Sequence, residues 1–190
     1  MLSMSAFLTY LAGIRVAISG HAAAVFPVLR TALESACYAY LIAKKPELAE
    51  VWLRRHDDGD SLKACRRAFD GAVRKVAADV DREQAGGGAW LLEAYEVAID
   101  FGAHPNIKGV VGHARMEEDV EDDLFLRVSI AGLYGADHWQ TFRGFVACAD
   151  FALAIAVVLT RALASPDAAR HEELQRLNDR KNALADTLTD

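Results

Sequence analysis

The sequence predicts a mainly α-helical protein: a single bundle of six or seven helices with one β-hairpin inserted between them. Three observations support this fold class. Apolar residues make up 53% of the 190 residues and charged residues 25%, an ordinary balance for one globular domain over 1–190. Prolines number only four, and apolar side chains recur at steps of three and four along most of the chain. Only around 109–131 does this spacing give way to alternation, which is typical of strands.

The first two predicted helices are strongly apolar. Residues 1–18 form an N-terminal helix, and Arg15 with the lack of a basic leader argues against a signal peptide. Its predicted packing stripe consists of Phe7, Leu11, Ile14 and Ile18. The second helix runs over 22–43, where Arg30 and Glu34 are the only formal charges, so it is predicted to be buried.

The middle of the chain is predicted to form three helices separated by turns. Pro46 opens a short helix, and Asp60 or Ser61 caps a long amphipathic one that continues to about Val80. The three glycines at 86–88 mark an interhelical break. The next helix, over 90–106, carries an apolar stripe whose members are Leu91, Tyr95, Ala98 and Phe101.

The remaining elements are the hairpin and two helices. Residues 109–131 are predicted to form a β-hairpin with an acidic tip, and Asp137 caps a helix that runs to Ala164. This helix is nearly long enough to span a membrane, but Asp150 and Arg161 favour a place in the bundle core. The last helix, over 166–188, carries a narrow leucine seam that could pack onto the bundle or serve as an oligomerisation arm. The seam consists of Leu174, Leu177, Leu184 and Leu188.

A carboxylate stripe on the 90–106 helix is the first candidate site. Glu93, Glu96, Asp100 and His104 share one face if the helix continues to its end, where Pro105 stops it. Such a set could bind a divalent metal or share a proton. A metal centre in a bundle usually takes ligands from facing helices, and the sequence has no second motif of this kind. A solvated acidic face is therefore the favoured interpretation, and no metal or cofactor is expected.

The charges within the apolar helices are the second candidate site. Each buried charge needs a partner, because an unpaired one costs several kcal/mol. We therefore predict one polar cluster inside the bundle, consisting of Arg30, Glu34, His104, Asn106 and Asp150. A structural role is favoured, and the catalytic alternative uses Arg30, Glu34, Asp100 and His104.

Net charge and cysteines restrict the partners and the compartment. With a net charge of −6, a general nucleic-acid or membrane surface is not indicated. A basic strip containing Lys63, Arg67 and Arg74 would be the route to nucleic acid, although a solvated charged face is commoner. The three cysteines are far apart and fall within apolar helices, so we predict free thiols in a reducing cytoplasm.

Two features together resemble a known group. They are the R-x-x-x-E step from Arg30 to Glu34 and the sequence Ala103-His104-Pro105-Asn106 before a hairpin. Over about 26–163 the chain resembles bacterial helical proteins related to the HEPN group, some of which act in phage defence and toxin–antitoxin systems. The resemblance implies a helical bundle that tends to dimerise. Catalytic HEPN proteins cleave RNA with an R-x(4–6)-H motif, which is missing around His104; Arg15 and His21 have the spacing, but Ser19-Gly20 breaks the helix between them.

The sequence leaves three functional classes open, so it does not decide whether the protein is an enzyme. The favoured class is a non-catalytic helical interaction or oligomerisation protein of the bacterial cytosol, with a homodimer as the favoured assembly and no membrane association. The alternative is a HEPN-like ribonuclease or another hydrolase. The third is a metal-binding bundle.

Overall fold

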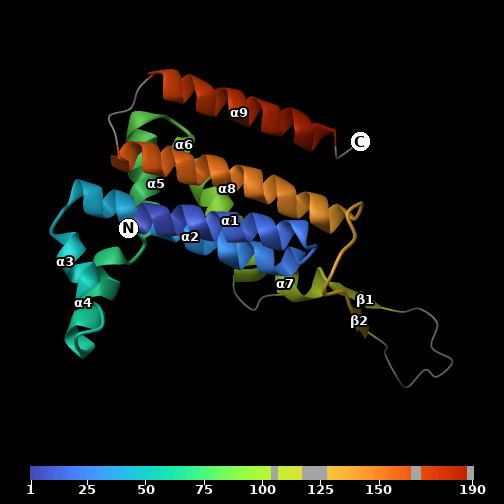
Figure 1. The fold of residues 1–190 in the computed structure, drawn as a ribbon, viewed down its shortest axis with the longest axis horizontal. Helices are drawn as coiled ribbons and strands as arrows, with labels where there is room; N and C mark the ends of the chain where they lie inside the picture. Colours follow the sequence, from blue (N-terminus) through green and yellow to red (C-terminus); the bar gives the residue numbers. More distant parts are fainter. Residues whose placement is uncertain (104–106, 117–127, 164–167, 188–190) are drawn as a thin grey trace.

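The computed structural model describes residues 1–103, 107–116, 128–163 and 168–187 of the chain. Its elements in chain order are α1 Leu2–Ile18, α2 Ala22–Lys44, α3 Leu48–Leu53, α4 Gly59–Phe69, α5 Ala72–Glu83, α6 Gly87–Ala98, the π-turn η1 Ile99–Ala103, α7 Ile107–Val111, β1 Ala114–Met116, β2 Val128–Ile130, α8 Trp139–Leu163 and α9 Ala168–Asp186 (Figure 1). The predicted class, a mainly α fold with one inserted hairpin, is confirmed. Within the described residues the helical segments outnumber the predicted six or seven, because one predicted helix is split and residues 107–111 form a short extra turn.

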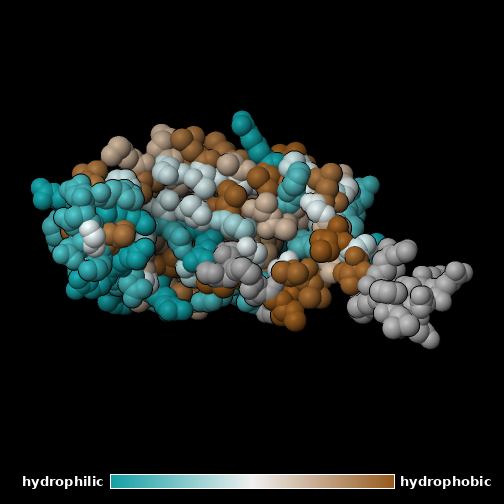
Figure 2. Space-filling view, turned by 90° about the horizontal axis from the view of Figure 1, so that it is seen from below, coloured by the Kyte–Doolittle hydropathy of each residue, from teal (hydrophilic) through white to brown (hydrophobic). Residues whose placement is uncertain are grey.

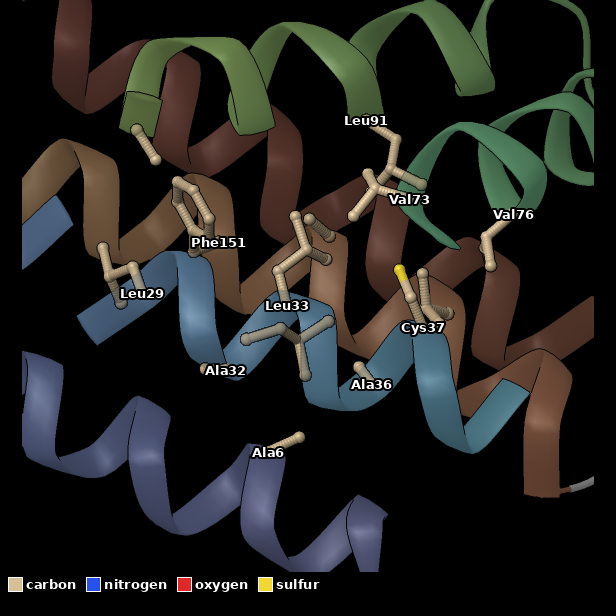
Figure 3. Packing of buried hydrophobic residues seen from close by; sticks show 14 of the residues in the cluster. Ala6, Leu29, Ala32, Leu33, Ala36, Cys37, Val73, Val76, Leu91 and Phe151 are labelled. Atoms are coloured by element: carbon tan, nitrogen blue, oxygen red, sulfur yellow. The ribbon is translucent and has the colours of Figure 1, made fainter. Parts of the chain in front are cut away.

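Helix α2 is the centre of the core, as its composition predicted. Leu29, Leu33 and Cys37 on this helix are completely buried. Figure 3 shows α1 on one side of α2, with Val73, Val76 and Leu91 from α5 and α6 and Phe151 from α8 on its other sides. Because helices pack on several sides of α2 and leave only a narrow strip around Ala24 and Thr31 exposed, a mostly apolar sequence is what this position requires.

Helix α1 does not pack through the predicted stripe. Its buried residues are Ala6, Gly13 and Ala17, and these contact α2 and α8. Phe7, by contrast, is 50% exposed, and Leu11 and Ile18 are exposed as well. Only Ile14 of the predicted stripe packs against the core. The correction has a steric reason: small residues let α1 approach α2 closely, whereas the large ones would hold it away.

The predicted long helix after Asp60 is two helices. Gly71 has a φ of +60°, in the left-handed region that glycine adopts at little cost, and it separates α4 from α5. The N-cap also differs from the prediction, since the carboxylate of Asp58 accepts a hydrogen bond of 2.7 Å from the backbone N–H of Ser61. The break turns the chain, so α4 and α5 line two sides of one cleft.

The predicted 90–106 helix is regular only as far as Ala98. Beyond it, η1 contains Gly102 with a φ of +153°, a conformation that ends the helical phase. A Cβ at this position would lie 2.8 Å from the carbonyl oxygen of Ala23, so Gly102 also permits the close approach of η1 to α2. The face shared by Glu93 and Glu96 therefore does not continue in register, and His104 with Asn106 lies outside the described residues.

The predicted hairpin is present, but the short helix α7 that precedes its first strand was not predicted. β1 and β2 are antiparallel, with Arg115 opposite Ser129. Residues 109–111 belong to α7 rather than to a strand, and the acidic tip at 117–123 falls outside the described residues. Figure 2 shows hydrophobic residues gathered on the face near α7 and the hairpin, where Ile107, Val110 and Ile130 are exposed.

The last two helices differ in how far they are buried. Among the described residues, α8 is the one helix long and apolar enough to cross a membrane by length and composition, a test that core helices also pass. Phe151, Ala154 and Val158 on α8 are almost completely buried in the bundle. Helix α9 lies along the outside of α8 (Figure 1). Of its predicted leucine seam, Leu177 and Leu184 are exposed and Leu188 lies outside the described residues.

Candidate functional site

Arg30 and Glu34 of α2 form a hydrogen-bonded network with a tyrosine of α6. Arg30 Nε donates a 2.9 Å hydrogen bond to Glu34 Oε1, and the Tyr95 hydroxyl donates one of 3.0 Å to the same oxygen. Arg30 Nη2 in turn donates to the Tyr95 hydroxyl over 3.2 Å. The guanidinium also lies over the Tyr95 ring, 5.2 Å from its centroid. Arg30 and Glu34, which the sequence predicted to be paired, are therefore brought together.

The position of Tyr95 follows from the helix period. Leu91 and Ala98, which share its predicted stripe, are both completely buried, so this face of α6 meets α2. A tyrosine between them buries its ring and needs a partner for its hydroxyl. Glu34, one turn from Arg30 on α2, provides that partner.

Burial and the Glu34 charge alter the ionisation of the neighbouring groups. Burial raises the pKa of Tyr95, and the charge and hydrogen bond of Glu34 raise it further. Burial lowers the pKa of Arg30, but Glu34 outweighs burial and the net change is upward. Arg30 therefore remains a cation and Tyr95 a neutral hydroxyl at physiological pH, so neither group is poised to transfer a proton.

A cleft of about 510 Å³ opens beside this network. Glu34, Tyr38 and Tyr95 form one wall, from α2 and α6. The other walls come from the turn after α3 and from the α4–α5 junction, and they contribute Arg55, Cys65, Arg66, Phe69, Asp70 and Arg74. This volume lies within the usual range for small-molecule sites.

Asp150 does not join the predicted polar cluster. Its Oδ1 accepts a 2.6 Å hydrogen bond from the Nζ of Lys181 on α9. The prediction that Asp150 pairs with Arg30 and Glu34 is therefore wrong, because Lys181 on the last helix is its partner instead. His104 and Asn106, the other two predicted members, lie outside the described residues.

A second cation, Arg143 on α8, is held by aromatic rings. Its guanidinium lies 3.4 Å from the centroid of Phe101 and 5.2 Å from that of Phe26. Burial lowers the pKa of Arg143. A smaller cleft of about 310 Å³ lies here, and Arg143, Asp150 and Glu93 all line it.

The carboxylates that were predicted to share one face of the 90–106 helix lie in different environments. Glu93 is exposed, and Glu96 is exposed and lies 3.5 Å from the guanidinium of Arg74 on α5. Asp100 belongs to η1. Within the described ranges, no group of three or more histidine, cysteine, aspartate or glutamate side chains is arranged to hold a metal ion.

The residues of the predicted basic strip lie in different surroundings. Lys63 pairs with Asp60 at the start of α4, and Arg74 lines the large cleft.

Cys37, Cys65 and Cys148 are free and buried. Burial raises the pKa of Cys148 to about 11 and that of Cys37 further, so neither is an activated nucleophile at neutral pH.

Sequence reasoning missed three residues that matter here. Tyr95 was assigned only to an apolar stripe, although a buried tyrosine calls for a hydroxyl partner. Lys181 gave a weak signal, because it lies seven residues after Leu174 on the inward face of α9. Arg55 gave no sequence signal, because it lies in a turn in which most residues are charged.

Comparison of the chain with protein-family models, with curated proteins and with solved structures gives no match. The resemblance to the HEPN group therefore stays a prediction.

Proposed function

We propose that the protein is a non-catalytic helical interaction protein of the bacterial cytosol that self-associates through the outer face of α1. The observation that carries this proposal is the division of α1 into two seams. The inner seam contains Ala6, Tyr10, Gly13 and Ala17, all packed against the bundle. The outer seam contains Met4, Leu8, Leu11, Arg15 and Ile18, all exposed.

Both seams have the spacing of a helix–helix contact. Successive members lie four and three residues apart, which is the a/d repeat of helices that pack side by side. The inner seam already has its partners in α2 and α8. The outer seam has a similar length, larger side chains and a single charge, so it supports a further helix contact.

A second copy of the chain is the proposed partner. Two α1 helices related by a two-fold axis perpendicular to them would run antiparallel, and each would present the same seam to the other. Arg15 lies near one end of the seam, so the two-fold axis would separate the two arginines rather than bring them together. Leu8 and Leu11 would lie near the middle of the contact.

Light scattering on the purified protein tests this proposal. We expect a dimer for the wild type and a monomer for Leu8→Asp/Leu11→Asp, with unchanged circular dichroism. Leu184→Asp is the matched control, because Leu184 is 60% exposed on α9, the other predicted oligomerisation arm. A monomeric wild type contradicts the proposal, and so does a dimer that only Leu184→Asp dissociates. Wild-type binding to lipid vesicles without dimers would assign the seam to a membrane surface instead.

A second candidate function, hydrolysis by a HEPN-like enzyme, has one observation in its favour: Arg30, Glu34 and Tyr95 meet at the edge of the large cleft. An RNA-cleavage assay tests it with the wild type, Glu34→Gln, His104→Ala and His21→Ala. Activity that is lost in Glu34→Gln or His104→Ala supports it. Absence of cleavage by the wild type, or cleavage that survives every change, contradicts this assignment.

A further inference from the structure

The arginine-lined cleft between α2, α6 and the α4–α5 junction has a feature that the self-association proposal does not use. The Nε atom of Arg55 is buried and has no hydrogen-bond partner within the described residues. Buried donors are nearly always paired, because leaving one unpaired costs about 1–3 kcal/mol, and an exception calls for an explanation. Arg55 lines the cleft, so a ligand seated there could reach the guanidinium to which this atom belongs.

The charges around the cleft favour an anion. Arg55, Arg66 and Arg74 line it, together with the carboxylates of Glu34 and Asp70. Glu34 is already neutralised by Arg30 at 2.9 Å, and Arg74 has only a loose, exposed pair with Glu96 at 3.5 Å. Arg55 and Arg66 have no acidic partner among the described residues, so the cleft has a positive excess.

The inner part of the cleft is apolar. The ring of Phe69 stacks on that of Tyr38, with 4.2 Å between centroids and 22° between planes. Val73 and Ile99 continue this wall. Phe69 and Val73 are each only 3% exposed and support the wall from behind, so the surface offered to a ligand is that of the half-buried Tyr38 and Ile99. This surface lies beside the cations and suits a ligand with a charged end and an apolar or aromatic body.

We propose that this cleft binds a small phosphorylated molecule: a phosphomonoester whose organic part lies against Tyr38 and Ile99. Arginine is the side chain best matched to phosphate, because its planar donors pair with two phosphate oxygens at once. Arg55 and Arg66 hold the phosphate, and Arg74 exchanges its exposed pair with Glu96 for a contact with the ligand. This site is separate from the outer seam of α1, so it stands or falls independently of self-association.

Isothermal titration calorimetry with adenosine 5′-monophosphate, inorganic phosphate and adenosine tests the proposal. We expect the nucleotide to bind, phosphate to bind more weakly at the same site in competition with it, and adenosine not to bind measurably. Arg55→Gln should weaken nucleotide binding by about tenfold or more. Arg54→Gln is the matched control, since the neighbouring Arg54 is 66% exposed and paired with Glu50. Arg66→Gln and Arg67→Gln form a second pair, in which only Arg66 lines the cleft.

Several results would overturn the proposal. One is a wild type that binds neither the nucleotide nor phosphate at millimolar concentration. Another is binding that Arg55→Gln and Arg54→Gln weaken equally, which would indicate general charge attraction. A third is binding of single-stranded RNA without binding of the nucleotide, which would identify a polymer surface in place of a small-molecule site. Thermal unfolding of each variant separates loss of the fold from loss of the ligand.

Discussion

Helices α1 and α9 both lie against α8, yet they are attached to it in opposite ways. Helix α1 is apolar, packs closely through Ala6 and Ala17 and leaves Phe7, Leu8 and Ile18 exposed. Helix α9 is polar, and among the described residues one ion pair, from Lys181 in its C-terminal half to Asp150, links it to α8. A cleft of about 440 Å³, lined by Leu174 and Asn178 among others, remains beneath it. Close packing of small residues therefore makes α1 part of the core, whereas α9 lies on the surface of α8 and is packed less closely against it.

This difference predicts where the bundle opens first. Local stability follows the density of buried apolar contacts, so α9 should open at a lower free energy than α1.

The largest effect is expected on the inner seam of α1. Ala6 is completely buried, so Ala6→Leu forces three extra carbon atoms into a filled contact. We expect the free energy of unfolding to fall by about 1–3 kcal/mol, measured by urea denaturation. Ala12→Leu, the same change at an exposed position of the same helix, should alter it by less than about 0.5 kcal/mol. Equal effects of the two changes would mean that the small-residue seam is not tightly packed.

A smaller and more local effect is expected at the anchor of α9. In Lys181→Met the Asp150 carboxylate loses its partner, and we expect a loss of about 1 kcal/mol, moderated because Asp150 is still 29% exposed. Hydrogen exchange should accelerate along 168–186 and stay unchanged in α1. Arg176→Met is the control, since Arg176 and Glu173 form an exposed pair on the same helix. Accelerated exchange throughout the bundle would show that α9 belongs to the core after all.

The smallest effect concerns the thiol of Cys148, which reports on α1. The Cys148 thiol lies near Tyr10, whose pKa is raised by burial and then by the Cys148 charge. Because burial raises the pKa of Cys148 to about 11, its alkylation should be slow at pH 8. The rate should keep rising towards pH 11, whereas the rate of an unperturbed thiol levels off at about pH 10.

Mass spectrometry after iodoacetamide treatment identifies the modified cysteine. We expect Ala6→Leu to accelerate alkylation of Cys148, because it loosens α1, and Lys181→Met to leave it unchanged. The reverse pattern would show that α9, and not α1, shields this thiol.

The candidate site was only partly predictable. The step from Arg30 to Glu34 on a buried helix was enough to predict their pairing, because residues four apart are neighbours on a helix. The third member, Tyr95, lies 61 residues after Glu34. The period of its helix shows that the ring faces inward but not what the hydroxyl meets. Asp150 shows the same limit, since its need for a partner was evident and the choice of Lys181 was not.

The sequence by itself determined the helical class, the burial of α2 and the position of the hairpin, because these depend on local periodicity and on the apolar content of each segment. Only the tertiary structure decided which face of α1 turns inward and how the α4–α5 cleft forms. Two apolar seams on one helix have the same period, and the choice between them depends on how closely the neighbouring helices can approach. That distance is a property of the packed bundle, where the volumes of side chains from remote segments must fit together.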